Sequence, residues 1–350
     1  MDLIELIKIG STKNASDIHI TVGVPPVFRI NGKLHEYGEE YLKPDDTRKL
    51  VEEVLEERQM LELNEKGEID TSFSSPGIGR FRVNAYKQRG SFGMALRIIP
   101  LRIPTMEELG LPQIVKDLAR NPRGLILVTG PTGSGKTTTL ASIIDLINSE
   151  QNYHILTLED PIEYLHKHNK CIVNQREIGS DSLNFANALR AALRQDPDVI
   201  LVGEMRDLET ISIALTAAET GHLVLSTLHT LGASKTIDRV IDVFPPHQQQ
   251  QIRIQFASVI QGIISQQLLA KVDGSGRIAA FEVMVTTPAI RNLIREEKSH
   301  QIDTAIQTGG KYGMETMDNS ILELYKKGII SKDTALNQAF NLDLMKRAIL

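Results

Sequence analysis

The sequence of 350 residues has one cysteine, no tryptophan and few aromatic residues. Because Cys171 is alone, the chain cannot build an internal disulfide framework or a zinc site made of several cysteines. An aromatic content of 5% offers little support for the stacking platforms that bind single-stranded nucleic acid. A formal net charge of −5 argues against a broad nucleic-acid interface as well. We therefore expect no nucleic-acid partner.

Long apolar runs are also missing. The longest, such as Gly124–Thr129 and Val199–Gly203, fall far short of the roughly 20 residues that span a bilayer. The segment Met1–Ile9 contains acidic residues and lacks the sustained apolar stretch of a signal peptide. These absences predict a cytoplasmic protein with no direct membrane span.

A chain of this length predicts two domains, and the pattern of apolar residues and turn signals changes near residue 100. In the first part, Asn31-Gly32 stands between two short alternating segments and suits a type I′ hairpin turn. The segment Pro44–Leu63 has helical periodicity, and Arg80–Tyr86 with Ser91–Ile99 predicts a second strand pair. We interpret residues 1–100 as a small α+β domain, with a sheet extension of the following domain as the alternative.

Residues 101–122 contain several prolines and are expected to form a linker with a short helix at Met106–Arg120. Over residues 123–350, apolar strands alternate with helices, which predicts an α/β domain with a mostly parallel sheet covered on both faces. The expected strands are Leu125–Thr129, Ile155–Leu158, Val199–Val202 and Leu223–Thr227, followed by an edge hairpin of Leu268–Val272 and Arg277–Val285 and then by short helices.

A phosphate-binding loop is the most specific motif. Between a predicted strand and a predicted helix, the glycines allow backbone N–H groups to converge on phosphate oxygens, Lys136 supplies a cation, and the Thr137 hydroxyl can coordinate Mg²⁺. The alternative is a tight glycine-rich turn without a ligand. The loop and the start of its helix comprise Gly130, Pro131, Thr132, Gly133, Ser134, Gly135, Lys136, Thr137 and Thr138.

Hydrolysis also needs carboxylates that order the metal and the attacking water. Glu204 directly follows the apolar strand Val199–Gly203, and Glu159, Asp160 and Glu163 follow an earlier strand. In a doubly wound sheet, both strand ends open on the same edge as the phosphate loop. Each acid by itself also fits a helix cap or a solvated position.

Two histidines, His222 and His229, flank the strand Leu223–Thr227, and together they are candidates for a sensor of the γ-phosphate. A lone histidine is more often structural. Arginines can neutralise the transferring phosphoryl group, although each one alone is more simply explained as a solvated surface residue. The candidates are Arg80, Arg82 and Arg97 in the first domain and Arg190 and Arg194 on a predicted helix.

Four segments occur in an order that resembles the type II/type IV secretion ATPase superfamily. They are similar to its Walker A, Asp box, Walker B and His box motifs, and the four together are far more specific than the phosphate loop alone. The segments are Gly130–Thr138, Leu156–Glu163, Leu193–Asp207 and Thr220–His229.

Within that superfamily the chain is most similar to the retraction ATPases of type IV pili. Ala15–His19, Gly79–Asn84, Ala289–Glu296 and Gly313–Asp318 carry this likeness, so the resemblance covers nearly the whole sequence. The helix at Ala289–Glu296 would be amphipathic in any case, and its special role rests on the likeness alone.

The resemblance implies a PAS-like first domain, a RecA-like ATPase domain, a homohexameric ring and ATP bound where the two domains meet. It implies that Glu163 orients the water and that Glu204 lies near Mg²⁺, partly through water, while His222 and His229 act as sensors. Arg82 and Arg97 would approach the phosphates, with weaker supporting assignments for Glu159, Asp160, Arg190, Arg194 and Arg239.

The implied function is a motor that powers pilus retraction and twitching motility, at the inner face of the cytoplasmic membrane and on an inner-membrane platform protein. Extension ATPases commonly carry an additional amino-terminal domain and a tetracysteine zinc site, and their absence here favours retraction. A pilus assembly or type II secretion ATPase, or an accessory retraction ATPase, remains the alternative. Two alternatives from other functional classes are a RecA-like DNA motor and a non-enzymatic, nucleotide-dependent scaffold.

Overall fold

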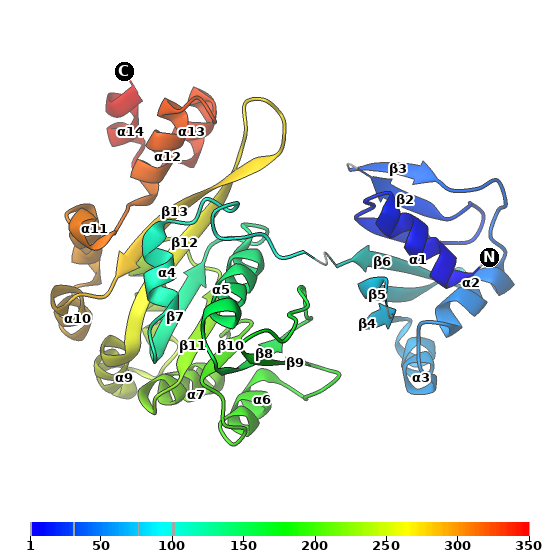
Figure 1. The fold of residues 1–350 in the computed structure, drawn as a ribbon, viewed down its shortest axis with the longest axis horizontal. Helices are drawn as coiled ribbons and strands as arrows, with labels where there is room; N and C mark the ends of the chain where they lie inside the picture. The colour runs from blue at the N-terminus through cyan, green and yellow to red at the C-terminus, as the bar shows by residue number, and fades with distance from the viewer. Residues whose placement is uncertain (1, 31, 76, 100–101, 350) are drawn as a thin grey trace. The chain divides into compact units, whose positions relative to one another are not determined.

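The computed structural model describes residues 2–30, 32–75, 77–99 and 102–349. The chain divides into two compact units (Figure 1). The first unit runs to Arg102 and includes Glu163–Leu165, and the second holds Ile103–Ile162 and continues from His166. Within the described ranges, no helix combines the length and apolar character needed to cross a membrane.

The first unit contains a six-stranded antiparallel sheet with the strand order β3-β2-β1-β6-β5-β4. Its core forms because alternate residues of the long strands point to one face, where Phe81, Val83 and Ala85 are fully buried. The strands are β1 (Asp17–Ile20), β2 (Val27–Ile30), β3 (Lys33–Glu36), β4 (Glu68–Ser75), β5 (Gly79–Gln88) and β6 (Ser91–Ile98), and the helices are α1 (Leu3–Thr12), α2 (Pro44–Glu52) and α3 (Glu57–Lys66).

The α+β interpretation of this unit is confirmed, with two details changed. The region Pro44–Leu63 is not one helix: α2 ends at Glu52, and α3 begins at Glu57 with its own capping box. The predicted hairpin between β2 and β3 is present, with Ile30 paired to Lys33, whereas Asn31 of its turn lies outside the described residues.

The second unit contains a seven-stranded sheet with the order β13-β12-β7-β11-β10-β8-β9. The strands from β12 to β9 run parallel, and β13 closes one edge antiparallel to β12. This is the predicted α/β sheet with its edge hairpin, although β12 is longer than expected and β9 was not predicted. The strands are β7 (Gly124–Thr129), β8 (His154–Glu159), β9 (Ile172–Glu177), β10 (Val199–Val202), β11 (Leu223–Leu228), β12 (Ile260–Ala270) and β13 (Arg277–Val285).

Helices cover both faces of this sheet because the strands are apolar on both sides. Ile126 and Val128 of β7 pack with α4 and α5, while Leu125 and Leu127 belong to the core shared with α6 through α11. A smaller core joins α12, α13 and α14 to β12 and β13. The helices, followed in Figure 1, are α4 (Gln113–Ala119), α5 (Lys136–Glu150), α6 (Phe185–Ala192), α7 (Leu208–Glu219), α8 (Ala233–Asp242), α9 (Pro246–Val259), α10 (Pro288–Arg295), α11 (Ile302–Gln307), α12 (Met317–Lys326), α13 (Lys332–Gln338) and α14 (Leu342–Ile349).

The expected linker at 101–122 is corrected from residue 103 onward. Met106, Leu111, Val115 and Leu118 are buried in the core around β7 and α5, so this segment belongs to the second unit. Its helix is also shorter than predicted and covers only Gln113–Ala119. Leu101, where the linker was expected to begin, lies outside the described residues.

Candidate functional site at the carboxyl edge of the sheet

The predicted motifs follow strands that end on one edge of the seven-stranded sheet. The pairing of Leu228 with Thr129 aligns the ends of β11 and β7, and Val202 pairs with Leu158 where β10 and β8 end. The phosphate loop, His229 and Glu204 therefore follow carboxyl ends of parallel strands, and Glu159 is itself such an end. The expectation that the strands before the two carboxylate clusters end on the same edge as the phosphate loop is confirmed.

The phosphate loop leaves β7 at Gly130 and enters α5 at Lys136. Its backbone has φ values of +144° at Gly130, +77° at Gly133 and +88° at Gly135, which side-chain-bearing residues rarely adopt. Lys136 is buried, and its ammonium group donates to the carbonyls of Gly130 and Pro131 at 2.9 and 3.0 Å. The loop thus curls around a cation at the amino terminus of a helix, an arrangement that favours anions.

Two buried hydroxyls at the loop have no hydrogen-bond partner among the residues that the structure describes. They are Thr129 Oγ1, at the end of β7, and Ser134 Oγ, within the loop. Buried polar groups are nearly always satisfied, so such atoms mark a place where a ligand or ordered water is expected. Together with the cation and the glycine-rich backbone, they fit a polyanionic ligand such as a nucleotide phosphate.

Glu204 and His229 are brought together from two neighbouring strands. The His229 Nε2 atom lies 3.5 Å from a Glu204 carboxylate oxygen, and the Arg206 guanidinium lies 2.7 Å from the other oxygen. The Glu204 side chain is 18% exposed, so it is accessible but partly shielded from water. Arg206 was not among the predicted site residues, although it stands two positions after Glu204 in the same motif.

Glu159 ends β8 and is 8% exposed, yet it is already engaged. It accepts hydrogen bonds from the Thr157 hydroxyl at 2.6 Å and from Gln175 at 3.1 Å. The peptide bond that follows, Asp160–Pro161, is cis. The structure therefore places Glu159 as an anchored carboxylate beneath the turn that follows β8.

The turn that follows Glu159 is held by Glu177, which was not predicted as a site residue. Glu177, at the end of β9 and 3% exposed, accepts the N–H of Ile162 at 3.0 Å. Its sequence neighbourhood gave little signal, because β9 is of mixed polarity and was not predicted as a strand. Glu163 follows on an exposed stretch that is grouped with the first unit.

The two histidines lie at opposite ends of β11. His222 precedes Leu223, which pairs with Gly124 at the start of β7, so His222 is at the amino edge of the sheet. The six residues of β11 separate it from the edge with the phosphate loop by roughly 20 Å. Its Nδ1 atom lies 3.0 Å from the carbonyl oxygen of Ala217 at the end of α7. Within this chain, the histidines do not form one cluster.

The predicted arginines fall into two groups. On the sheet of the first unit, Arg82 and Arg97 are directly paired across β5 and β6, and Arg97 also forms an ion pair of 3.1 Å with Asp17. In the second unit, Arg190 forms an ion pair with Glu209, while Arg194 and Arg239 are exposed on or next to helices.

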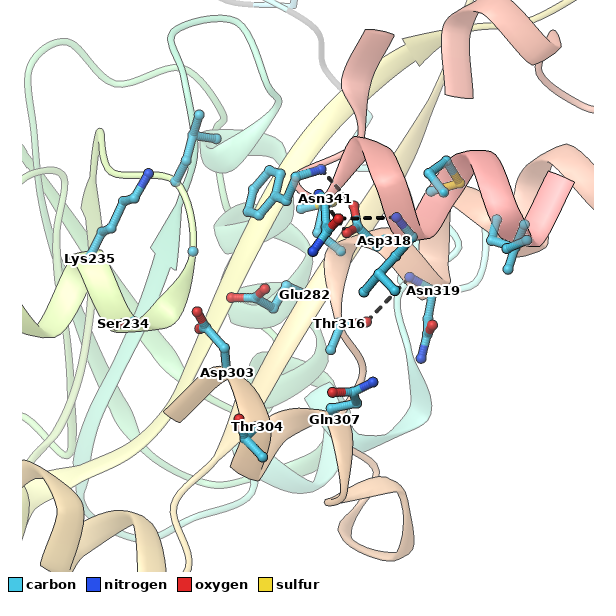
Figure 2. A pocket seen from close by; sticks show the side chains of 18 residues that line it. Ser234, Lys235, Glu282, Asp303, Thr304, Gln307, Thr316, Asp318, Asn319 and Asn341 are labelled. Atoms are coloured by element: carbon cyan, nitrogen blue, oxygen red, sulfur yellow. Dashed lines mark hydrogen bonds between the residues drawn. The ribbon is translucent and has the colours of Figure 1, made fainter. Parts of the chain in front are cut away.

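A cavity of about 450 Å³ lies elsewhere in the second unit (Figure 2). Glu282 and Asp303 point into the same space, and burial raises the pKa of both carboxyls. Glu282 accepts the N–H of Ala233 at 2.8 Å and so anchors the start of α8, while Asp318 accepts the backbone N–H groups of Phe340 and Asn341. The acids at this cavity are thus largely engaged in holding helix starts, and the phosphate loop does not line it.

Comparisons with known proteins agree with the motifs. The sequence matches the family described as Type II/IV secretion system protein over residues 5–337. The type IV pilus retractation ATPase PilT of Pseudomonas aeruginosa is 50% identical over 97% of this chain and 98% of its own length. The twitching motility protein of Neisseria gonorrhoeae is 47% identical over 91% of this chain and 86% of its own. A crystal structure of the pilus retraction motor PilT with bound ADP superimposes with a TM-score of 0.93, at 50% identity and 99% coverage of both chains.

Proposed function

Because the chain belongs to the type II/IV secretion system protein family, we propose that it is an ATP-hydrolysing motor that powers the retraction of type IV pili. The observation that carries this proposal is the juxtaposition of a phosphate loop with Glu204 and His229 at one sheet edge. The proposed role in pilus retraction is supported by the names of two relatives, PilT and a twitching motility protein. It is also supported by the pilus retraction motor whose structure this chain matches.

In this proposal, different residues of the chain bind the phosphates, sense the γ-phosphate and orient the attacking water. The backbone N–H groups of the loop and the Lys136 ammonium bind the β- and γ-phosphate oxygens. Glu204 follows β10, one strand beyond β11 in the sheet, and His229 beside it senses the γ-phosphate. Glu163 orients the attacking water. Arg82 and Arg97 contribute positive charge from the first unit, which links phosphate chemistry to domain movement.

The oxygen donors at the loop suit a magnesium ion. Mg²⁺ is usually held in proteins by one or two oxygen ligands together with substrate phosphates and water, rather than by a closed protein cage. The Thr137 hydroxyl and the Glu204 carboxylate, the latter partly through water, provide such a set. When bound, the ion neutralises charge on the β- and γ-phosphates.

The assembly and location are part of the same proposal. The chain acts as a homohexamer at the inner face of the cytoplasmic membrane, against an inner-membrane platform protein of the pilus machinery. The absence of a membrane-spanning helix in the described residues fits a peripheral association through that platform.

Two experiments test the proposal. Purified protein should release phosphate from ATP only with Mg²⁺, without stimulation by DNA, and should run as a hexamer. A cell that lacks the gene should keep abundant surface pili and lose twitching. Loss of surface pili instead would identify an assembly motor, and the absence of phosphate release would indicate a nucleotide-dependent scaffold.

A further inference from the structure

Gln266 is a buried amide that lies beside the phosphate loop. It belongs to β12, where Ser265 pairs with Thr129, so Gln266 comes immediately after the point where β7 gives way to the loop. The residue is 3% exposed, which is unusual for glutamine unless both ends of its amide are hydrogen-bonded. No nucleotide motif contains it, because β12 follows the loop by more than 120 residues in the sequence.

Both ends of this amide bind the phosphate-loop segment. The Gln266 Nε2 group donates to the carbonyl of Ser134 at 2.6 Å, and its Oε1 atom accepts from the Thr139 hydroxyl at 2.7 Å. Ser134 is inside the loop, and Thr139 is in the first turns of α5. One side chain from a neighbouring strand therefore ties the loop to the helix that follows it.

The contact with Ser134 has a consequence for the adjacent N–H. The carbonyl of Ser134 and the N–H of Gly135 belong to the same planar trans peptide, so they point in opposite directions. When Gln266 holds the carbonyl on its own side, the Gly135 N–H is directed away from β12. That N–H precedes Lys136, the first residue of α5, and belongs to the unpaired donors at the start of a helix.

Gln266 also explains two of the loop glycines. A Cβ atom at Gly130 would lie 2.2 Å from the Gln266 carbonyl oxygen, and one at Gly135 would lie 2.9 Å from its Nε2 atom. The first contact is with backbone, which cannot move aside cheaply. The same residue of β12 thus lies against the first and last glycines of the loop and leaves no free space for a side chain at either position.

We propose that Gln266 is a positioning residue for the nucleotide phosphates, which holds the Ser134–Gly135 peptide in the orientation that presents the Gly135 N–H to a phosphate oxygen. This inference rests on the proposed ATPase function. Its action is indirect, since the Gln266 amide contacts the loop and α5 rather than the phosphates themselves.

The first test replaces the amide while keeping the length of the side chain. In the full-length protein, Gln266→Met removes both hydrogen bonds. The Kd of a fluorescent ADP and the KM for ATP should each rise about tenfold or more, whereas kcat at saturating ATP should change by less than about threefold. Gln267→Met is the matched control. Gln267 is the next residue of β12 and 7% exposed, and the alternation of the strand points it to the opposite face, so its replacement should change Kd less than about twofold.

The second test uses pH. In Gln266→Glu, an ionised carboxylate would face the Ser134 carbonyl oxygen and repel it, whereas a protonated carboxyl can donate as the amide does. The ADP affinity of Gln266→Glu, relative to that of the unchanged protein, should therefore recover as the pH falls from about 8 to about 6. A residue that merely fills space would give no such recovery.

The outcomes separate this inference from the proposed function. Wild-type ADP affinity in Gln266→Met, or a flat relative pH profile in Gln266→Glu, overturns the positioning role even if the protein hydrolyses ATP normally. A failure of the unchanged protein to hydrolyse ATP overturns the proposed function, while the ADP measurements still test Gln266. If Gln266→Met does not fold, Thr139→Val removes one of the two hydrogen bonds and should weaken ADP binding in the same direction.

Discussion

The carboxyl and amino edges of the seven-stranded sheet are built from the same strands but are satisfied very differently. At the carboxyl edge, buried Thr129 and Ser134 hydroxyls have no partner among the described residues. At the amino edge, the Asp198 carboxylate accepts the His154 N–H at 2.8 Å, and His222 lies against the end of α7. The carboxyl edge thus keeps two buried hydroxyls beside the phosphate loop for a ligand, whereas the named polar groups of the amino edge join strands and helices.

This difference teaches where function and stability are separable in the molecule. Parallel strands gather all their carboxyl ends on one edge, so loops from distant parts of the sequence can share a site there. The amino ends receive the chain from the helices, and their polar groups are used for closing turns. Replacements at the two edges should therefore affect different measurements.

The largest effect is expected at Glu204. Glu204→Ala removes the carboxylate beside His229 and should lower kcat for ATP by about 100-fold or more, with ADP affinity nearly unchanged. Steady-state phosphate release and fluorescent ADP binding measure the two quantities. Glu219→Ala, an exposed acid at the end of α7, is the control and should turn over normally. Undiminished turnover in Glu204→Ala would remove that residue from the proposed mechanism.

A large effect on stability is expected in the connection that leaves β8. Burial lowers the pKa of His166 to about 4. Since the unfolded chain binds this proton near pH 6.5 and the folded protein does not, stability is complete above about 6.5 and falls as the pH drops toward 4. The loss should reach about 2–3 kcal/mol across that window.

Chemical denaturation at several pH values measures this loss. His166→Gln should reduce the slope of the unfolding free energy against pH between about pH 6.5 and about pH 4. His247→Gln, at an exposed histidine, should leave that slope unchanged. An unaltered slope in His166→Gln would mean that other groups cause the acid sensitivity.

A moderate effect on turnover is expected at His229. This side chain lies 3.5 Å from Glu204, so His229→Asn should reduce kcat about tenfold through the lost interaction at the proposed γ-phosphate position. Single-turnover hydrolysis separates this effect from product release. Equal losses of kcat in His229→Asn and His222→Asn would break the comparison between the two edges.

The smallest effect is expected at His222. Its ring contacts the Ala217 carbonyl, so His222→Ala should lower the free energy of unfolding by about 1 kcal/mol while leaving the Kd of ADP unchanged. Thermal unfolding and ADP titration of the same sample measure both. A raised Kd without loss of stability would place His222 in a nucleotide site.

Much of the second unit could be predicted from sequence because its signals are local. The glycine pattern before Lys136, the apolar strands that end at Thr129 and at Val202, and the turn-rich hairpin at Gly274 each reflect residues close in the chain. The first unit was predicted less completely: its β1 has only four residues and gives little periodic signal, and the break between α2 and α3 was missed although α3 begins with a local capping box.

The sequence by itself determined the chemistry of the phosphate loop, the order of the four motifs and the presence of two domains. Only the tertiary structure decided that His229 and not His222 stands beside Glu204, and that residues 103–122 pack into the second unit. Only the tertiary structure also revealed that Gln266 forms hydrogen bonds with the phosphate loop and with α5. The physical reason is the register of the parallel strands. The local sequence pattern indicates which face of a strand a residue occupies. The pairing of β12 with β7 and of β11 with β10 decides which side chains from distant parts of the sequence lie next to each other.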